Sequence, residues 1–309
     1  MLGRILQGAS RSGKLRGLIE KAPVSRSVVT RFIAGDNADD AVHVAAELAE
    51  QNLAVSIDHL GEDIETLEHA RQVRTEYLAL LGKLHEARLT GSTEVSVKLS
   101  AVGQSLQDDG EKVALEHARQ ICQAAADVGT TVTLDMEDHT TTDSTLTILE
   151  DLRKEFPSTG AVLQAYLYRT EEDCKALAHS GSRVRLCKGA YNEPASVAYQ
   201  DQGDVDRSYV RCMKALLGGE GYPMLATHDP RLIEIAGSLA ARYRREQGTY
   251  EYQMLFGVRP NEQQRLVQSG ERMRVYLPYG EDWYGYMMRR MAERPANVGF
   301  FLRAMATKK

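Results

Sequence analysis

Eight short segments rich in Val, Leu, Ile, Thr and Tyr alternate along this 309-residue chain with segments of helical periodicity. This alternation predicts a parallel sheet, because successive parallel strands need a crossover helix between them. The predicted strands are Leu53–Asp58, Glu94–Leu99, Thr131–Met136, Val162–Leu167, Val184–Lys188, Met224–Thr227, Tyr250–Leu255 and Met273–Leu277. Eight such strands are typical of one closed α/β barrel of the (βα)8 TIM type rather than an open sheet.

The segments between the strands carry apolar stripes at helical spacing, most clearly Ile64–Leu84 and Glu111–Val128. No linker divides the chain into two domains. We expect residues 1–50 to form an N-terminal helical arm and residues 51–309 to form the barrel. The length suits one barrel with a short extension.

Composition excludes several classes of protein. With 43% hydrophobic and 26% charged residues, the chain is globular, and its net charge of −5 argues against a nucleic-acid partner. The four cysteines show no CxxC spacing, which favours reduced thiols in the cytoplasm. Neither a membrane-spanning segment nor a secretory signal is visible.

The first 31 residues are basic, with seven Lys and Arg residues against Glu20 alone. The interpretation that we favour is a helical arm packed on the barrel. The alternative is a basic amphipathic segment that makes a peripheral contact with the inner face of the cytoplasmic membrane.

Polar residues occupy the carboxyl ends of nearly all the predicted strands, where barrels of this kind place their chemistry. They are Asp58, Lys98, the run Asp135–Asp138, Gln164, Arg185, Lys188, the run Thr227–Asp229, Gln253 and Tyr276. We therefore expect a polar pocket at the mouth of the barrel.

One group of polar residues near the C-terminus has helical spacing. Counted from Tyr286, the later members stand three, four and seven residues on; they are Arg289, Arg290 and Glu293. On a helix they share one face. Adjacent guanidinium groups on a common face can clamp a carboxylate, since each planar fork matches two oxygens. The alternative is a solvated charged face.

Alternation in the second strand directs Ser96 and Lys98 into the barrel lumen. A lumenal ammonium needs a counter-ion, and Asp135 on the next strand is the expected one. A purely structural ion pair is the alternative interpretation.

The segment Arg185–Tyr191 combines two cations with Gly189 and Ala190, which let a backbone approach a ligand closely. This suits a phosphate or a reduced flavin anion, although a plain turn would look similar. His228 ends the sixth strand as a hydrogen-bond donor to a cofactor or as a satisfied core histidine. No metal site is predicted, because no metal-ligand spacing of histidines occurs.

Seven motifs, taken in order, resemble the proline dehydrogenase family in its short monofunctional bacterial form. They are Val95–Ser100, Thr133–Asp138, Leu163–Tyr166, Arg185–Tyr191, Ala226–Asp229, Glu251–Gly257 and Arg274–Asn297. The segment Ser56–Glu62 extends the resemblance back to the first strand. The resemblance implies a distorted (βα)8 barrel with FAD at its mouth and a final helix lying over it.

The resemblance also implies residue roles. The substrate carboxylate would be held by Lys98, Arg289 and Arg290, and the substrate ring would be walled by Leu255, Tyr276 and Tyr286. Asp135 would balance Lys98, and Arg185 would lie near the flavin N5. FAD would be contacted by Asp135, Gln164, Arg185, Lys188, Gly189, Ala190, Thr227, His228 and Glu293.

The implied reaction is oxidation of L-proline to Δ1-pyrroline-5-carboxylate by hydride transfer from C5 to FAD N5. Electrons would pass to a membrane quinone, and a downstream pyrroline-5-carboxylate dehydrogenase would be a further partner. Tyr276 matches the family position that favours proline over hydroxyproline. Asn192 departs from the tryptophan of many relatives, which puts one adenine or ribose contact in doubt. Glu62 is predicted to pair with Arg289 as a gate over the substrate.

Three other functions fit parts of the pattern. They are a Schiff-base lyase or aldolase using Lys98 or Lys188, a flavin reductase acting on a folate, and a regulatory barrel that binds an amino acid. A bound flavin bleached by L-proline would separate the dehydrogenase from all three.

Overall fold

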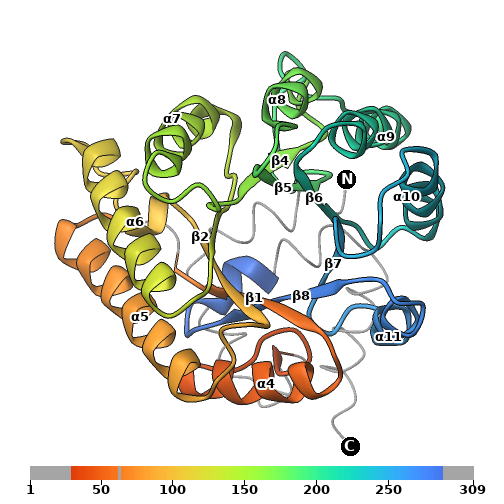
Figure 1. Ribbon diagram of the computed structural model, residues 1–309. Coiled ribbons are helices and arrows are strands. Elements are labelled where there is room, and N and C mark those ends of the chain that lie inside the picture. The colour runs from red at the N-terminus through yellow and green to blue at the C-terminus, as the bar shows by residue number, and fades with distance from the viewer. Residues whose placement is uncertain (1–28, 62–63, 288–309) are drawn as a thin grey trace, which may run out of the picture.

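The computed structural model describes residues 29–61 and 64–287, and its strands form one eight-stranded sheet. The strands are β1 (Ala54–His59), β2 (Thr93–Val97), β3 (Val132–Leu134), β4 (Ala161–Gln164), β5 (Arg183–Cys187), β6 (Tyr222–Ala226), β7 (Glu251–Leu255) and β8 (Met273–Tyr279). All paired strands are parallel, in the order β3-β2-β1-β8-β7-β6-β5-β4. The first and last strands pair directly, so the sheet curls round on itself (Figure 1).

Gly160 joins the two ends of this sheet. It accepts a hydrogen bond from the Leu134 amide at 2.9 Å and donates one to the Val132 carbonyl at 2.8 Å. A Cβ at Gly160 would come within 2.5 Å of Thr133 Oγ1, so this close approach requires glycine. The result is a nearly closed barrel, which confirms the predicted (βα)8 class.

Helices surround the barrel in Figure 1. They are α4 (Ala38–Glu50), α5 (Leu67–Glu86), α6 (Gly110–Asp127), α7 (Thr142–Arg153), α8 (Thr170–Leu177), α9 (Gln202–Gly218), α10 (Pro230–Arg242) and α11 (Pro260–Gln268), with short 3-10 turns η1 (Ser100–Val102) and η2 (His139–Thr141). The helix α4 lies between α5 and α11, outside β1 and β8. It therefore occupies the place in the ring that follows β8.

The chain sequence accounts for the helix starts. Asn37 and Asp40 form a capping box at α4, and Asp229 caps α10, whose first residue is Pro230. These residue types satisfy the amide groups that have no partner within a helix. Among the described residues, no helix is long and apolar enough to cross a membrane.

Each predicted strand overlaps an observed one, but the predicted ends of β2, β3 and β4 were two or three residues too long, and those of β5 and β6 were one residue too long. The strand β2 ends at Val97, because η1 begins at Ser100 directly after it. The strand β4 ends at Gln164, because its carbonyl accepts the Leu167 amide in a turn that leads into α8.

The apolar core lies between the sheet and the helices, whereas the lumen of the barrel is polar. Alternate strand residues such as Val55, Ile57 and Val97 pack outward in the core. The inward residues are buried polar or charged side chains: Ser56, Asp58, Glu94, Ser96, Lys98, Asp135, Arg185, Glu251, Gln253 and Arg274. In most barrels of this fold, branched aliphatic side chains fill the lumen. The lumen of this barrel is instead filled by paired charged and polar side chains.

Candidate active site at the mouth of the barrel

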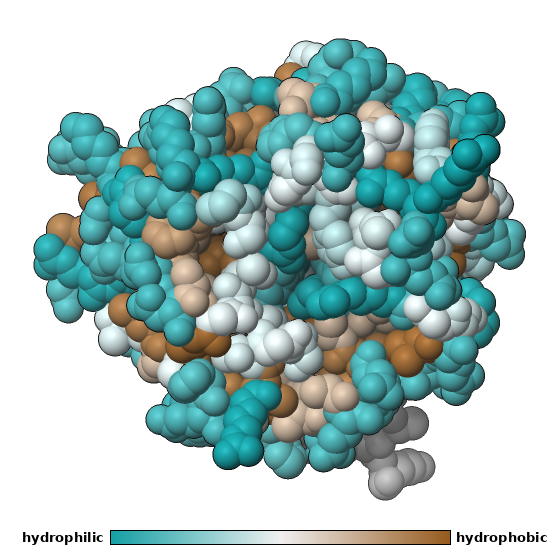
Figure 2. Space-filling model, in the orientation of Figure 1, coloured by the Kyte–Doolittle hydropathy of each residue, from teal (hydrophilic) through white to brown (hydrophobic). Residues whose placement is uncertain are grey.

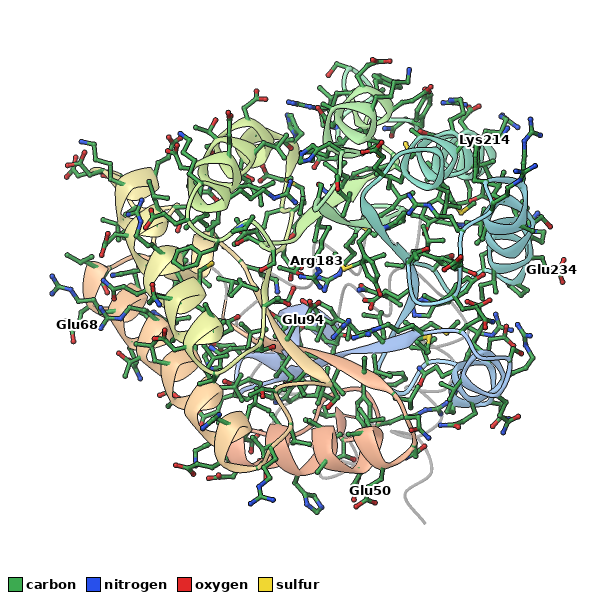
Figure 3. The ribbon with its side chains drawn as sticks, viewed as in Figure 1. Glu50, Glu68, Glu94, Arg183, Lys214 and Glu234 are labelled. Atoms are coloured by element: carbon green, nitrogen blue, oxygen red, sulfur yellow. The ribbon has the colours of Figure 1, made fainter. Side chains whose placement is uncertain are left out.

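The floor of the lumen is a buried ion network. Glu94 contacts Arg183 and lies 3.2 Å from Arg185, while Arg274 binds Glu251 at 2.6 Å. Figure 3 shows Glu94 and Arg183 facing each other at the centre of the ring, where hydrophilic residues gather in Figure 2. Burial alone would raise the pKa of Glu94, but the surrounding guanidinium groups hold it well below its usual value.

Arg185 occupies the middle of the lumen and donates to side chains on several strands. Its partners are Gln253 Oε1 at 2.6 Å, Ser96 Oγ, Asp135 Oδ1 and Ser56 Oγ at 2.8 Å each, and Glu94 Oε1 at 3.2 Å. These bonds use all five N–H groups of a guanidinium. A direct hydrogen bond from Arg185 to a cofactor would therefore require one of them to break.

Above Arg185, Lys98 lies at the carboxyl end of the strands, between two carboxylates. Its Nζ is 2.7 Å from Asp58 Oδ2 and 3.4 Å from both Asp135 Oδ2 and Tyr276 Oη. The Tyr276 hydroxyl donates to Asp135 at 2.6 Å. The structure thus places Lys98, Asp135 and Tyr276 together, as the sequence predicted, and adds Asp58.

Asp58 was visible in the sequence as a polar strand end but received no role. The signal that points to it is alternation, which directs Asp58 into the lumen together with Ser56. Burial raises its pKa to about 6, the charge of Asp135 acts in the same direction, and Lys98 opposes both. Burial also favours a raised pKa at Asp135, but Lys98 and Arg185 outweigh it and leave that pKa below its ordinary value.

A second group of predicted residues follows β5 and β6. Lys188 Nζ is 2.6 Å from Asp206 Oδ1 and 3.4 Å from Asp229 Oδ2. The backbone φ of Gly189 is +114°, and a Cβ there would overlap the ring of Tyr166. This position accepts no side chain, because the Tyr166 ring already packs against the backbone of Gly189.

His228 and Gln164 complete this side of the mouth. The Leu255 amide donates to His228 Nε2 at 2.9 Å, so the neutral ring carries its proton on Nδ1 and can act as a donor. Gln164 donates to the Glu137 carbonyl at 2.7 Å, and Thr227 Oγ1 accepts the Asp229 amide at 3.1 Å.

Several predicted residues lie outside the described part of the chain: Glu62, Arg289, Arg290 and Glu293. Tyr286 is buried and lies within the described residues, which end at residue 287. The arginine clamp, the gate and the final helix over the mouth therefore stay predictions. Within the described residues, no three His, Cys, Asp or Glu side chains gather as a metal site.

A family model described as proline dehydrogenase matches residues 41–303. The chain belongs to the proline dehydrogenase family. It is thus an oxidoreductase of a flavin-dependent family.

Relatives of known function agree with this membership. Proline dehydrogenase 1 of Bacillus subtilis subsp. natto is 40% identical over 288 residues, which cover 93% of this chain and 94% of the relative. Proline dehydrogenase of Deinococcus radiodurans is 38% identical over 281 residues and 90% of both chains.

Solved structures agree on the barrel. Proline utilization A from Bdellovibrio bacteriovorus, inactivated by N-propargylglycine, matches with a TM-score of 0.80 and 26% identity. The match covers 87% of this chain but only 33% of that one. Proline utilization A from Bradyrhizobium japonicum matches with a TM-score of 0.72 at 20% identity, which supports the fold alone.

The residues at the mouth fit a flavin nucleotide. Lys188 supplies a cation suited to a phosphate, and the neutral His228 ring carries its N–H on Nδ1. A few oriented polar groups of this kind are typical of a cofactor site.

Proposed function

We propose that this protein oxidises L-proline to Δ1-pyrroline-5-carboxylate, with FAD as the hydride acceptor. The supporting observation is the Lys98 ammonium, buried at the carboxyl end of a barrel whose sequence matches proline dehydrogenases over most of its length. A buried ammonium at this position is a binding group for a small carboxylate, because it is already desolvated and oriented.

The chain's own residues would bind and orient the amino acid. Lys98 would contact the carboxylate together with Arg289 and Arg290. Tyr276, Tyr286 and Leu255 would wall the ring, and the hydrogen bond from Tyr276 to Asp135 fixes the position of one wall. Holding the substrate in one orientation removes a large entropic part of the barrier.

The proposed cofactor contacts are Asp135, Gln164, Arg185, Lys188, Gly189, Ala190, Thr227, His228 and Glu293. When bound, FAD would supply the hydride acceptor for C5 of the substrate. Lys188 would place a positive charge beside a phosphate, and Asp206 and Asp229 hold that lysine in position. Arg185 would contribute its charge from below the mouth rather than a new hydrogen bond.

Further partners belong to the same proposal. Electrons would pass from the enzyme to a membrane quinone, and the product would pass to a pyrroline-5-carboxylate dehydrogenase. The protein would be cytoplasmic; under the alternative interpretation of the basic segment 1–31, that segment would also contact the inner face of the cytoplasmic membrane.

One anaerobic titration tests the proposal. The purified protein should show flavin absorption bands that L-proline bleaches and D-proline does not. Lys98→Met should retain the bands and lose bleaching at low proline concentration, because the carboxylate loses a buried cation. A colourless protein, or one inactivated by borohydride plus substrate, would overturn the proposal in favour of a Schiff-base enzyme.

A further inference from the structure

Within the described part of the chain, one carboxylate oxygen of Asp58 has a partner and the other has none. The residue is fully buried, and its Oδ2 lies 2.7 Å from Lys98 Nζ. Among the described residues, its Oδ1 is buried and meets no hydrogen-bond donor. A buried acceptor without a donor is unfavourable, so this oxygen is suited to receive a hydrogen from a ligand.

Asp58 lies among buried charges of both signs. At the top of the described lumen, Lys98 and Arg185 are positive and Asp58 and Asp135 are negative, contacts of 2.7 to 3.4 Å link them, and Arg185 also lies 3.2 Å from Glu94. A zwitterionic amino acid adds no net charge to this set. Release of its ammonium proton to solvent would lower the net charge of the buried site by one, whereas transfer of that proton to a group within the site leaves the net charge unchanged.

We propose that Asp58 accepts the proton that leaves the substrate's ammonium nitrogen, while the substrate carboxylate replaces Asp58 as the counter-ion of Lys98. This step rests on the proposed function. The N–H bond breaks, an O–H bond forms on Asp58, and the net charge of the site does not change. The nitrogen keeps its electron pair, which then forms the C=N bond as the C5 hydride leaves.

The groups that face Asp58 favour it over Asp135 as the proton acceptor. They are Lys98 directly after β2, Asp135 directly after β3, Tyr276 and Tyr279 on β8, and Tyr77 on α5. Burial raises the pKa of Asp58 to about 6, so its carboxylate is present at neutral pH and its acid form is accessible. The pKa of Asp135 is lowered, because Lys98 and Arg185 outweigh the effect of burial, so Asp135 holds a proton less readily.

The test measures flavin reduction by L-proline in stopped-flow at pH 5 to 8.5, with FAD-loaded enzyme. For the wild type, the reduction rate at low proline concentration should rise with pH and level off above an inflection near 6. Asp58→Asn should lower the rate at least 100-fold and remove this inflection, because the amide cannot accept the proton.

A ligand without an amine separates proton transfer from structural support. Cyclopentanecarboxylate binding, followed by the shift of the flavin spectrum, should be unchanged or tighter in Asp58→Asn, because Lys98 has lost a competing anion. A role limited to folding or to positioning Lys98 would weaken this binding and would contradict the inference.

Asp135→Asn is the matched control, since it removes the other carboxylate beside Lys98. This variant should keep the pH dependence and move its inflection to lower pH, because the charge of Asp135 raises the pKa of Asp58. If Asp58→Asn does not retain flavin, Asp58→Glu supplies the test, because it should keep a pH-dependent rate with a displaced inflection.

The outcomes are distinguishable. A wild-type flavin that L-proline does not reduce would refute the proposed function. A wild-type flavin that is reduced, together with an Asp58→Asn rate within threefold of it or an unchanged inflection, would refute the role of Asp58 alone. Loss of pH dependence in Asp58→Glu would refute it as well.

Discussion

The Tyr276 hydroxyl donates a 2.6 Å hydrogen bond to Asp135 Oδ2, the same oxygen that lies 3.4 Å from Lys98 Nζ. The guanidinium of Arg185 lies 5.2 Å from the centre of the Tyr276 ring. One tyrosine is therefore fixed by a carboxylate at its hydroxyl and by a cation at its face. This arrangement gives the ring a single orientation at the proposed substrate site.

Removal of the Tyr276 hydroxyl should weaken catalysis without abolishing it. Tyr276→Phe is expected to lower kcat/KM for L-proline by roughly 10- to 100-fold, because a hydrogen bond to a charged group is worth about 1.5–3 kcal/mol. Steady-state kinetics with an artificial electron acceptor measure the change. An unchanged kcat/KM would mean that the bond to Asp135 does not order the site.

Removal of the Tyr276 ring should instead change specificity. Tyr276→Ser opens space beside the substrate ring, so the ratio of kcat/KM for hydroxyproline to that for proline should rise at least 10-fold. Tyr276→Phe is the control, because it keeps the ring and should leave this ratio near the wild-type value. Equal ratios in the two variants would contradict the proposed steric role.

Local sequence pattern predicted the barrel and the direction of its side chains. The alternation of inward and outward side chains can be seen within a single strand. It therefore predicted that Lys98 points into the lumen and that Asp135, on the neighbouring segment, lies close to it. It did not identify partners across the barrel, such as Arg185 and Ser56, which are 129 residues apart. Strand ends were also missed by a few residues, since turn hydrogen bonds rather than propensity end β2 and β4.

The network around Arg185 and the pairing of Lys98 with Asp58 therefore needed the structure. These contacts form between inward side chains at the same level along the barrel axis. The register between neighbouring strands determines which side chains share a level. A single sequence gives the composition of the lumen but not this register. For the same reason, the raised pKa of Asp58 could not be foreseen from its position at a strand end.

The turn at Gly189 should not tolerate a side chain. In Gly189→Ala, the added Cβ would overlap the Tyr166 ring at a backbone φ of +114°, and backbone strain of this kind alone costs about 1–3 kcal/mol. Displacement of Lys188 and Ala190 should also reduce FAD retention. The ratio of flavin to protein absorbance after gel filtration measures this loss, and thermal unfolding measures the loss of stability.

Gly181→Ala provides the control for backbone strain. Gly181 also has a positive φ, of +79°, but no heavy atom lies within 4 Å of an added Cβ. This variant should lose some stability and keep its flavin. Equal flavin loss in both variants would show that the overlap with Tyr166 is not the cause.

The ion network on the floor of the lumen should be essential for stability. Glu94→Gln removes one buried negative charge from among Arg183, Arg185 and Arg274, so the free energy of unfolding should fall by about 3–5 kcal/mol. Urea unfolding measures the change. Glu116→Gln is the control, because Glu116 pairs with Arg119 at 3.1 Å on the surface and should lose less than about 1 kcal/mol. Similar losses would contradict a special role for the buried network.

His59 should make the protein less stable in acid. Its ring packs against Tyr279 and Tyr77, with centroids 5.1 and 6.0 Å apart, and burial lowers its pKa from 6.5 to about 4. The pKa of His59 is lower in the folded protein than in the unfolded chain. The contribution of the neutral ring to the free energy of unfolding is therefore complete above pH 6.5 and is lost as the pH falls through 4. One unit of pKa shift corresponds to 1.36 kcal/mol, so the total loss is about 3 kcal/mol.

The neighbouring Asp58 has the opposite effect on the pH dependence of stability. Its pKa in the folded protein, about 6, exceeds the ordinary 3.8, so its contribution to the free energy of unfolding is lost as the pH rises. The effect of His59 must therefore be measured as the difference between the wild type and a His59 variant. His59→Phe keeps an aromatic ring between the two tyrosines and cannot be protonated. Between pH 6.5 and 4.5, urea unfolding with excess FAD should show a wild-type loss about 2–3 kcal/mol larger than that of the variant. Parallel stability curves for the two proteins would show that folding does not lower the pKa of His59.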